Sequence, residues 1–369
     1  MHTWAWGRDM ARIATTGSRD TQDIRRRSAE VGCASALLAM ALVWSPAARA
    51  DEGGVSYWIP GFYGSLAAAP LVPGWSVANI YYHTSVKASG DVAFAREVPV
   101  GRLTVPFAAQ VNANLNATAD LGVVIPQYTF ATPVLGGQAS VGMLVPFGNA
   151  RTSVDALLTA GVGPLGFTVG GSRTDDALGF SDLSPVASLR WNSGVHNWMV
   201  YATGDVPVGL YNPSSLANLG LGHGTIDAGG GYTYFNPQTG HELSAVLGFT
   251  YNFINPDTQY KNGVDMHLDW GASQFLTKQW MVGLVGYVYD QLSCDSGSGD
   301  RVGCFESRVI GIGPQIGYIF PLGDMQGYLN LKAYGEFDSA HRPDGWNVWL
   351  TFAISPERPT ASPSRLITK

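Results

Sequence analysis

Three ionisable residues, Asp265, His267 and Asp269, stand two positions apart in the stretch NGVDMHLDWGAS. Carboxylate and imidazole groups at this spacing could hold a metal ion or supply part of a hydrolytic site. On a β-strand such residues share one face, with neighbours about 6.6 Å apart. The alternative is a polar network inside a β-barrel, in which these residues pair with groups on adjacent strands. We favour the network and predict no catalytic residue, no metal ion and no other cofactor.

The element that must position these residues is a strand, because Val264, Met266, Leu268 and Trp270 alternate with them. Strict alternation predicts one apolar face and one ionisable face. In a water-soluble sheet the apolar face packs on the core. In a membrane barrel it faces lipid, and the ionisable face lines the lumen. The remainder of the chain has to decide between these two interpretations.

The N-terminus predicts export. Three arginines precede the apolar run CASALLAMALVW, and the following SPAARA fits a small-x-small cleavage pattern, so we expect a signal peptide over residues 1–50. Its removal takes away 7 of the 22 Lys and Arg and 4 of the 28 Asp and Glu, which leaves 15 against 24 and a net charge of −9. This charge excludes a nucleic-acid-binding surface. The mature chain also has no run of about 18 apolar residues that could form a membrane-spanning helix.

The composition favours the membrane barrel. Charged residues make up 14% of the chain, against about 25% in ordinary soluble domains, while there are 46 Gly, 11 Trp, 16 Tyr and 15 Phe. Outer-membrane barrels have few charges, glycine where strands turn and pack, and aromatic girdles at both interfaces. A soluble β-sandwich would also alternate, but its polar faces would be rich in Lys and Glu instead of Asn, Thr and Ser.

Alternating segments of about ten residues recur from Trp75 onward and are separated by Gly, Pro, Asn or Asp. They predict an all-β fold, a transmembrane antiparallel up-and-down barrel over residues 74–355, followed by a C-terminal tail over 356–369. The expected strand cores are 75–84, 103–118, 121–131, 138–147, 153–171, 185–192, 197–206, 225–235, 243–254, 263–274, 279–290, 308–320, 326–336 and 346–354. This gives 14 strands, or 12 if the fifth, which contains a Gly-Pro break, is dropped with one neighbour.

The connections between these strands differ in length on the two sides. Bacterial barrels have short periplasmic turns and longer outside loops. The expected periplasmic set is PLGDM, LTKQ, NPQTGHE, WNSGVH and a tight turn near Asp120. The expected outside set is residues 85–102, 207–224, NPDTQYKN, the loop with Cys294 and Cys304, and DSAHRPDG. The TPVLGG connection is an exception to this rule.

The polar residues of the predicted strands define a wet inner wall. The clearest example is AQVNANLNATA, in which asparagines alternate with small apolar residues. The residues predicted to line the lumen along a substrate pathway are Asn112, Asn114, Asn116, Arg190, Asp205, Asp227, Asp265, His267, Asp269 and Lys332.

The segment ahead of the first strand, within residues 51–73, is apolar, aromatic and interrupted by proline. Exposure of this segment as a free tail would place large apolar side chains in water. We expect it to fold into the lumen as a plug through Tyr57, Trp58, Phe62 and Tyr63. The alternative is a segment that lines the periplasmic rim for stability.

Cys294 and Cys304 are the two cysteines that remain after signal cleavage, in the stretch SCDSGSGDRVGC. In an exported chain such a pair predicts a disulfide that closes one loop. The alternative is a weak cation site through Asp295 and Asp300, but two aspartates lack the number of oxygen ligands that calcium requires.

Several runs resemble the outer-membrane family named for the meta-pathway of phenol degradation. They are FSDLSPVASLRWN, GDVPVGLYNP, the long run from GYTYFNPQTGHELS to GYVYDQL, and IGPQIGYIFP. The resemblance extends over most of residues 53–356, and the recurring positions of the family are matched by Asp182, Pro207, Gly209, Tyr211, Asn255, Tyr260, Gly263, Gln291, Gly313 and Pro314. It implies a barrel of the wider group of hydrophobic-compound channels, similar to the long-chain fatty acid transporter and often encoded beside aromatic catabolism.

These observations predict an outer-membrane channel of a Gram-negative bacterium for passive uptake of small hydrophobic or aromatic compounds. Its expected partners are outer-membrane lipid, the permeant solutes and the barrel-assembly machinery, which would recognise the apolar face of the last strand, WNVWLTFAI. The alternatives are a porin for polar solutes, favoured by the asparagine ladder, a barrel hydrolase using Asp265 and His267, and a structural barrel. His241 and Ser244 resemble a hydrolase pair, but residues three apart on a strand face opposite ways.

Overall fold

The computed structural model describes residues 56–90, 109–162, 165–300 and 303–357. The predicted signal peptide and the C-terminal tail beyond residue 357 lie outside the described residues. The elements of the described part are the strands β1 (Gly74–Ser89), β2 (Ala109–Thr129), β3 (Gln138–Val162), β4 (Leu165–Phe180), β5 (Ser184–Ser193), β6 (His196–Asp205), β7 (Thr225–Phe235), β8 (His241–Asn252), β9 (Asp265–Phe275), β10 (Trp280–Gln291), β11 (Arg308–Leu322), β12 (Met325–Ala340) and β13 (Asp344–Pro356). In these ranges there is no helix long and apolar enough to cross a membrane.

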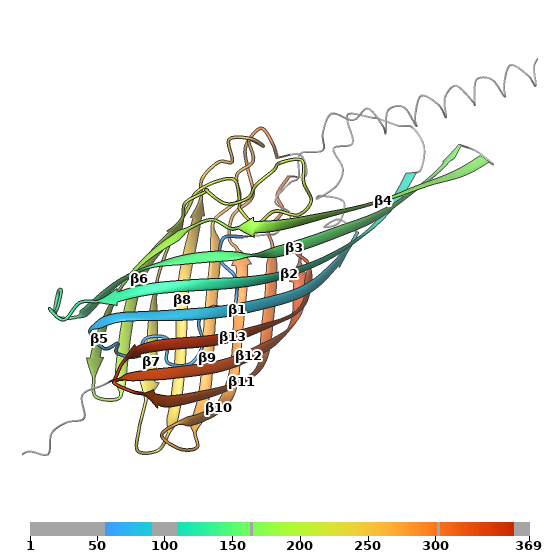
Figure 1. The fold of residues 1–369 in the computed structure, drawn as a ribbon. Coiled ribbons are helices and arrows are strands. Elements are labelled where there is room, and N and C mark those ends of the chain that lie inside the picture. Colours follow the sequence, from blue (N-terminus) through green and yellow to red (C-terminus); the bar gives the residue numbers. More distant parts are fainter. Residues whose placement is uncertain (1–55, 91–108, 163–164, 301–302, 358–369) are drawn as a thin grey trace, which may run out of the picture. The chain divides into compact units, whose positions relative to one another are not determined.

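Twelve of the strands close a ring in which neighbours are antiparallel (Figure 1). β1 pairs with β13 on one side and with β2 on the other, so the first and last strands form the seam. The ring continues from β2 to β3 and from β3 to β5, and then follows chain order to β13. The predicted antiparallel barrel is confirmed, and its ring has the alternative count of 12 strands instead of 14.

β4 lies outside this ring. β3 is 25 residues long and uses one edge for two partners in succession. Its residues 138–144 pair with β5, and its residues 147–162 pair with β4. β4 therefore continues the line of β5 past the ring, and in Figure 1 it runs beside the extended ends of β2 and β3.

The expected tight turn near Asp120 is wrong. β2 is continuous, and Asp120 lies within it, paired with His83 of β1 and Asn149 of β3. The buried residues Leu115 and Val123 on either side of Asp120 have the same parity, so the alternation continues without a turn. The Gly-Pro break of the fifth predicted strand falls at residues 163–164, between β3 and β4 and outside the described residues.

The connections now sort by end, apart from the three-residue connection 341–343, which lies at the same end as the long loops. Residues 130–137, 194–195, 236–240, 276–279 and 323–324 join strands at the short-turn end, where β1 begins and β13 ends. With Asp120 inside a strand, TPVLGG belongs to this set and is no exception. The opposite end, called here the long-loop end, carries the connections 206–224, 253–264 and 292–307.

Outward-facing side chains form an apolar band with aromatic residues at its edges. On β8 every second residue is exposed, including Leu243, Leu247 and Phe249, while the residues between them are buried. Aromatic groups gather at the short-turn end, as Trp75 with Tyr128 and Phe130, and Trp280 with Tyr318 and Phe320; at the other end Phe147 packs on Phe180 and Tyr251 on Phe253. Such girdles are typical of barrels that span a membrane.

Candidate functional site

The N-terminal segment, defined here as residues 56–73, lies against the inner wall of the barrel. Its polar atoms and rings contact inward-facing side chains of β3, β5, β6, β7, β8, β9, β11, β12 and β13. Because these strands are spread around the ring, the segment crosses the interior and is held from several sides.

Two charged residues of opposite sign hold one turn of this segment, and we call them the Lys332–Asp269 clamp. The Asp269 carboxylate accepts the backbone N–H of Gly61 at 2.9 Å and that of Tyr63 at 3.2 Å. The Lys332 ammonium donates to the carbonyls of Gly61, Phe62 and Tyr63 at 2.6, 3.0 and 3.3 Å. Gly61 has φ of +91°, a conformation that favours glycine. The clamp therefore supplies partners for three consecutive carbonyls and for two of the three N–H groups.

A second contact lies at the centre of the wall, where Trp58 stacks on His267 with a ring separation of 3.6 Å and an interplanar angle of 11°. His267 Nε2 lies 3.1 Å from both Asp227 Oδ2 and the Tyr201 hydroxyl. Thr250 donates a hydrogen bond to the same Asp227 oxygen at 2.6 Å. These polar groups are almost fully buried. The network fixes the imidazole ring on which Trp58 rests.

Further hydrogen bonds continue toward the short-turn end. Leu66 N–H donates to Glu242 at 2.7 Å, and Ala68 N–H donates to Thr233 at 3.0 Å. The Ser65 hydroxyl is 2.7 Å from that of Ser273 and accepts from Gln315 at 2.6 Å. Arg190 donates to the carbonyl of Ala67 at 3.4 Å. Buried backbone groups require such partners, and here the wall supplies them.

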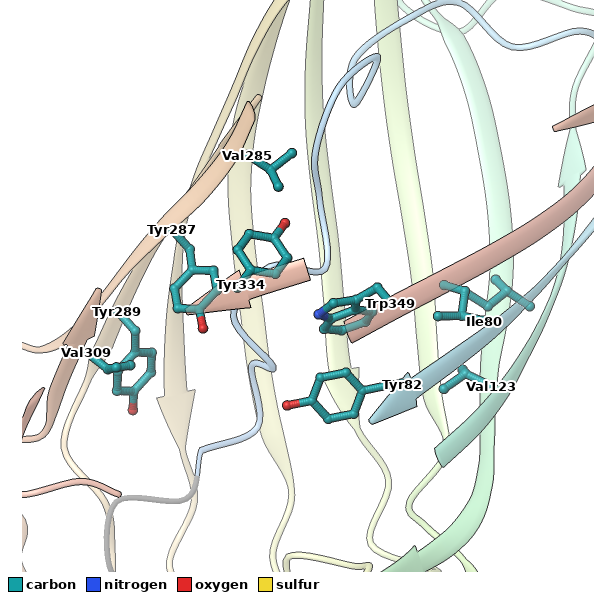
Figure 2. Close-up of a cluster of buried hydrophobic side chains, with 10 residues drawn as sticks. Ile80, Tyr82, Val123, Val285, Tyr287, Tyr289, Val309, Tyr334 and Trp349 are labelled. Atoms are coloured by element: carbon teal, nitrogen blue, oxygen red, sulfur yellow. The ribbon is translucent and has the colours of Figure 1, made fainter. Parts of the chain in front are cut away.

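Another part of the wall is rich in aromatic side chains. Figure 2 shows a buried cluster that includes Tyr82, Tyr287, Tyr334 and Trp349, contributed by β1, β10, β12 and β13. Ile59 and Phe62 of the N-terminal segment pack against this cluster, and the Phe62 ring meets the Trp349 ring edge to face at 6.2 Å. The segment therefore lies between a polar network on one side and an aromatic wall on the other.

The family model described as "Putative MetA-pathway of phenol degradation" matches residues 100–352, more than half of the chain. The chain belongs to this family. No curated protein sequence matches it. Of the solved structures, an outer-membrane channel from Pseudomonas putida F1 is similar in fold, with a TM-score of 0.57 and 14% identity over 80% of this chain and 99% of that chain. A FadL homologue from Pseudomonas aeruginosa gives a TM-score of 0.36 and 9% identity, over 84% of this chain and 98% of that one.

Four of the residues on which the family resemblance was based, Asp182, Gly209, Tyr211 and Asn255, lie in contacts of the long loops. Asp182 accepts the N–H of Gly209 at 2.7 Å and that of Leu221 at 2.6 Å, which ties the 206–224 loop to the start of β5. The amide of Asn255 donates to the Tyr211 hydroxyl at 2.8 Å and so joins the next loop. These residues therefore order the mouth of the barrel, and they do not belong to the network in its interior.

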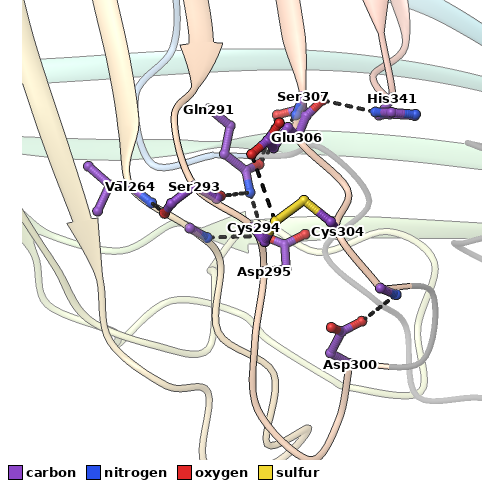
Figure 3. The surroundings of a disulfide bond; sticks show 12 residues. Val264, Gln291, Ser293, Cys294, Asp295, Asp300, Cys304, Glu306, Ser307 and His341 are labelled. Carbon is purple, nitrogen blue, oxygen red and sulfur yellow. Dashed lines mark hydrogen bonds between the residues drawn. A yellow bond between two sulfur atoms is a disulfide. The ribbon is translucent and has the colours of Figure 1, made fainter.

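Asp295 is the centre of the loop contacts at the third long connection (Figure 3). It accepts the N–H of Gly263 at 3.0 Å, the amide of Gln291 at 2.6 Å and the hydroxyl of Tyr260. Burial raises the pKa of Asp295, while these hydrogen bonds act in the opposite direction. The neighbouring disulfide between Cys294 and Cys304 confirms the prediction from the cysteine pair. The Asp295 carboxylate thus accepts hydrogen bonds from three residues of the protein.

Removal of the disulfide is expected to loosen this loop without disrupting the barrel. A Cys294→Ser, Cys304→Ser double variant loses the constraint on a ten-residue separation, worth about 3 kcal/mol in the chain-entropy model. We expect faster proteolysis within residues 292–307 and an unchanged folded band in a heat-modifiability gel. Loss of the folded band would contradict a role confined to the loop.

The structure places the predicted lumen residues in two groups. Inward-facing positions are held by Arg190, Asp205, Asp227, Asp265, His267, Asp269 and Lys332. The asparagine ladder differs from the expectation, because Asn112, Asn114 and Asn116 are exposed. The alternating residues Ala113 and Leu115 are buried instead, in a cluster with Val154 and Leu216 of the 206–224 loop. Where β2 extends beyond the ring, the loop covers its apolar face and the amides meet water.

The ionisable residues of β9 do not converge on one point. Asp265 accepts hydrogen bonds from Tyr289 at 2.8 Å and from Asn252 at 2.9 Å, His267 contacts Asp227, and Asp269 binds the N-terminal segment. In the described ranges the one group with metal-ligand spacing is Cys294, Cys304 and Glu306, and its two cysteines form the disulfide. The β9 residues therefore act in three separate contacts, and their geometry does not favour the hydrolase alternative.

Some wall residues were missed by the sequence reasoning, above all Glu242, Tyr201 and Gln315. Each has the inward parity of its strand, and Glu242 is 1% exposed. Their parity was a usable signal, because each falls on the face opposite to the exposed apolar residues. The partners of these residues on the N-terminal segment carried no such signal.

Proposed function

We propose that this member of the MetA-pathway family is an outer-membrane channel for passive uptake of small hydrophobic or aromatic compounds. The observation that carries the proposal is the aromatic N-terminal segment inside a barrel with an apolar outer band. The solved channel with a similar fold supports a channel role, and the family name supports a link to aromatic catabolism. A passage lined by aromatic side chains suits a hydrophobic permeant, which is poorly soluble in the water of an open pore.

Within this proposal the N-terminal segment is the plug, and Tyr57, Trp58, Phe62 and Tyr63 are its rings. We call the part of the wall that carries the aromatic cluster of β1, β10, β12 and β13 the Tyr82–Trp349 side. Small rearrangements of the four rings of the plug would open a path along this side. The porin alternative was favoured by the asparagine ladder as a polar lining of the lumen. These asparagines are on the exposed face of β2, and the buried face carries Ala113 and Leu115, so the ladder no longer supports a polar pore. The loops at 207–224 and 292–307 would form the mouth.

Uptake measurements test this function. Cells that carry the protein in the outer membrane are expected to take up labelled toluene severalfold faster than cells with an empty vector, because the lipopolysaccharide leaflet slows apolar solutes. Proteoliposomes are expected to swell little faster than protein-free liposomes in a pentose solution. Rapid swelling in the sugar would show an open aqueous pore, and unchanged toluene uptake would remove the aromatic-uptake proposal.

A further inference from the structure

The inner wall carries far more negative than positive groups. Six carboxylates stand at inward positions of the strands, namely Asp205, Asp227, Glu242, Asp265, Asp269 and Glu336. Inward-facing cations of the described strands are Arg190 and Lys332. Beyond the strands, Arg342 lies over the Tyr289 ring at the long-loop end, while Asp182 and Asp295 add two carboxylates at the same end. The imbalance therefore persists when the loops are included.

The two strand cations do not neutralise these carboxylates directly. Lys332 donates to three backbone carbonyls of the N-terminal segment, and Arg190 donates to Ser188 and to the carbonyl of Ala67. Within the described ranges neither forms an ion pair with a carboxylate, and the interior contact that meets ion-pair distance is the one between His267 and Asp227. Along the described strands, acidic groups therefore outnumber basic groups on the inner wall, and the two strand cations form no ion pair with them.

Three of the carboxylates also have an oxygen without a hydrogen-bond donor. These are Asp205 Oδ2, Asp227 Oδ1 and Glu242 Oε2, all buried. Asp205 ends β6 at the long-loop end, Asp227 is near the start of β7, and Glu242 is the second residue of β8 at the short-turn end. Buried acceptors without donors are costly, so the wall offers unused acceptors at both ends of its length.

Aromatic rings stand beside this acidic wall. The ring centres of Trp58 and Tyr201 are 6.1 Å apart, and those of Tyr63 and Tyr201 are 5.7 Å apart. Ring faces attract cations and tolerate neutral aromatic groups. Asp and Glu side chains arranged around a channel attract cations and repel anions. A low-dielectric wall strengthens both the attraction and the repulsion.

We propose that the lumen selects permeants by charge, so that neutral and cationic molecules with an aromatic or apolar body, such as amines, pass and organic anions such as carboxylates are excluded. This inference rests on the proposed uptake function and names its substrate class. The acidic wall supplies the discrimination, and the aromatic rings of the N-terminal segment accommodate the apolar body.

The test compares two permanently charged probes of similar size, benzyltrimethylammonium and benzenesulfonate. Proteoliposomes containing the full chain are loaded with either probe, and potassium with valinomycin cancels the diffusion potential. We expect the cation to leave about tenfold faster than the anion, because acidic groups outnumber basic groups along the wall that each probe passes. Planar bilayers under a potassium chloride gradient are expected to give a reversal potential of the cation-selective sign.

A variant set assigns the selectivity to the wall. Asp227→Asn with Glu242→Gln is expected to bring the two efflux rates closer together. The matched control is Asp290→Asn with Asp338→Asn, which removes two carboxylates at positions outside the inward-facing set and is expected to keep the ratio. A heat-modifiability gel shows whether each variant folds, and the wild-type reversal potential decides the question even where the wall variant does not fold.

Equal efflux of both probes, faster efflux of the anion, or retention of both would overturn the inference. Each of these results leaves the proposed function in place if toluene uptake is still accelerated. Failure of toluene uptake with preserved cation selectivity would instead remove the aromatic-uptake function and retain the charge selection.

Discussion

A chain that lacks residues 56–70 is expected to conduct ions severalfold better than the full chain. The deletion removes the aromatic rings that lie between the acidic wall and the Tyr82–Trp349 side, together with the backbone held by Lys332 and Asp269. Twelve strands enclose more space than the eight whose side chains just fill a barrel interior. Single-channel recording in planar bilayers measures the change.

The ring itself does not depend on these residues for its strand pairing, since β1 begins at Gly74. The deleted chain is therefore expected to fold, with the same heat-modifiable band as the full chain. A folded deletion variant with unchanged conductance would show that the N-terminal segment does not obstruct the lumen, and the plug proposal would then fail.

Lys332→Met is expected to have the second largest effect, an increase in the frequency and size of open events. The substitution leaves the carbonyls of Gly61, Phe62 and Tyr63 without their shared donor and leaves Asp269 without a nearby cation. Leaving a buried acceptor without its donor costs about 1–3 kcal/mol. This cost falls on the bound state of the N-terminal segment, so the segment should leave its position more often.

The matched control is Lys278→Met, which removes the same type of charge from an exposed turn at the short-turn end. It is expected to leave the recordings unchanged. If Lys332→Met matches this control, the clamp does not hold the segment. If it behaves like the deletion of residues 56–70, the clamp supplies most of the holding energy.

Much of the fold could be predicted because alternation reports the environment of each face directly. β8 was expected at 243–254 and runs over His241–Asn252, and its exposed and buried residues alternate without a break. The error at Asp120 arose because an Asp close to a Gly resembles a turn. The stronger signal was that apolar residues occupy odd-numbered positions both before and after Asp120. A turn between two strands does not require this alternation to continue in step.

The asparagine ladder shows where alternation stops being informative. Inside the membrane band a polar face must be the inner face, but near its beginning β2 extends past the closed ring, where its outer face can meet water. There the apolar residues Ala113 and Leu115 are covered by a loop, and the polar side chains become the outer surface. Polarity alone could not indicate where along the strand this change occurs.

The interior contacts could be predicted only as a general polar network. Gly61 and Asp269 are 208 residues apart in sequence, and Gly61 and Lys332 are 271 apart. Nothing in either local pattern specifies such a partner. An apolar segment with prolines predicted a buried location, but the atoms that bind it follow from the ring closing around it.

The seam between β1 and β13 has a consequence for the order of assembly. The N-terminal segment is joined directly to β1, yet it binds residues on β6 to β9 and on β12. Those strands lie far from the segment in sequence, so they must be in place before it can make all of its contacts. If the segment settles on the open, curved sheet before the first and last strands meet, it is enclosed as the sheet closes and never has to thread a finished pore. A barrel built this way is occluded from the moment it is complete, so the cell envelope is not exposed to an open channel during biogenesis.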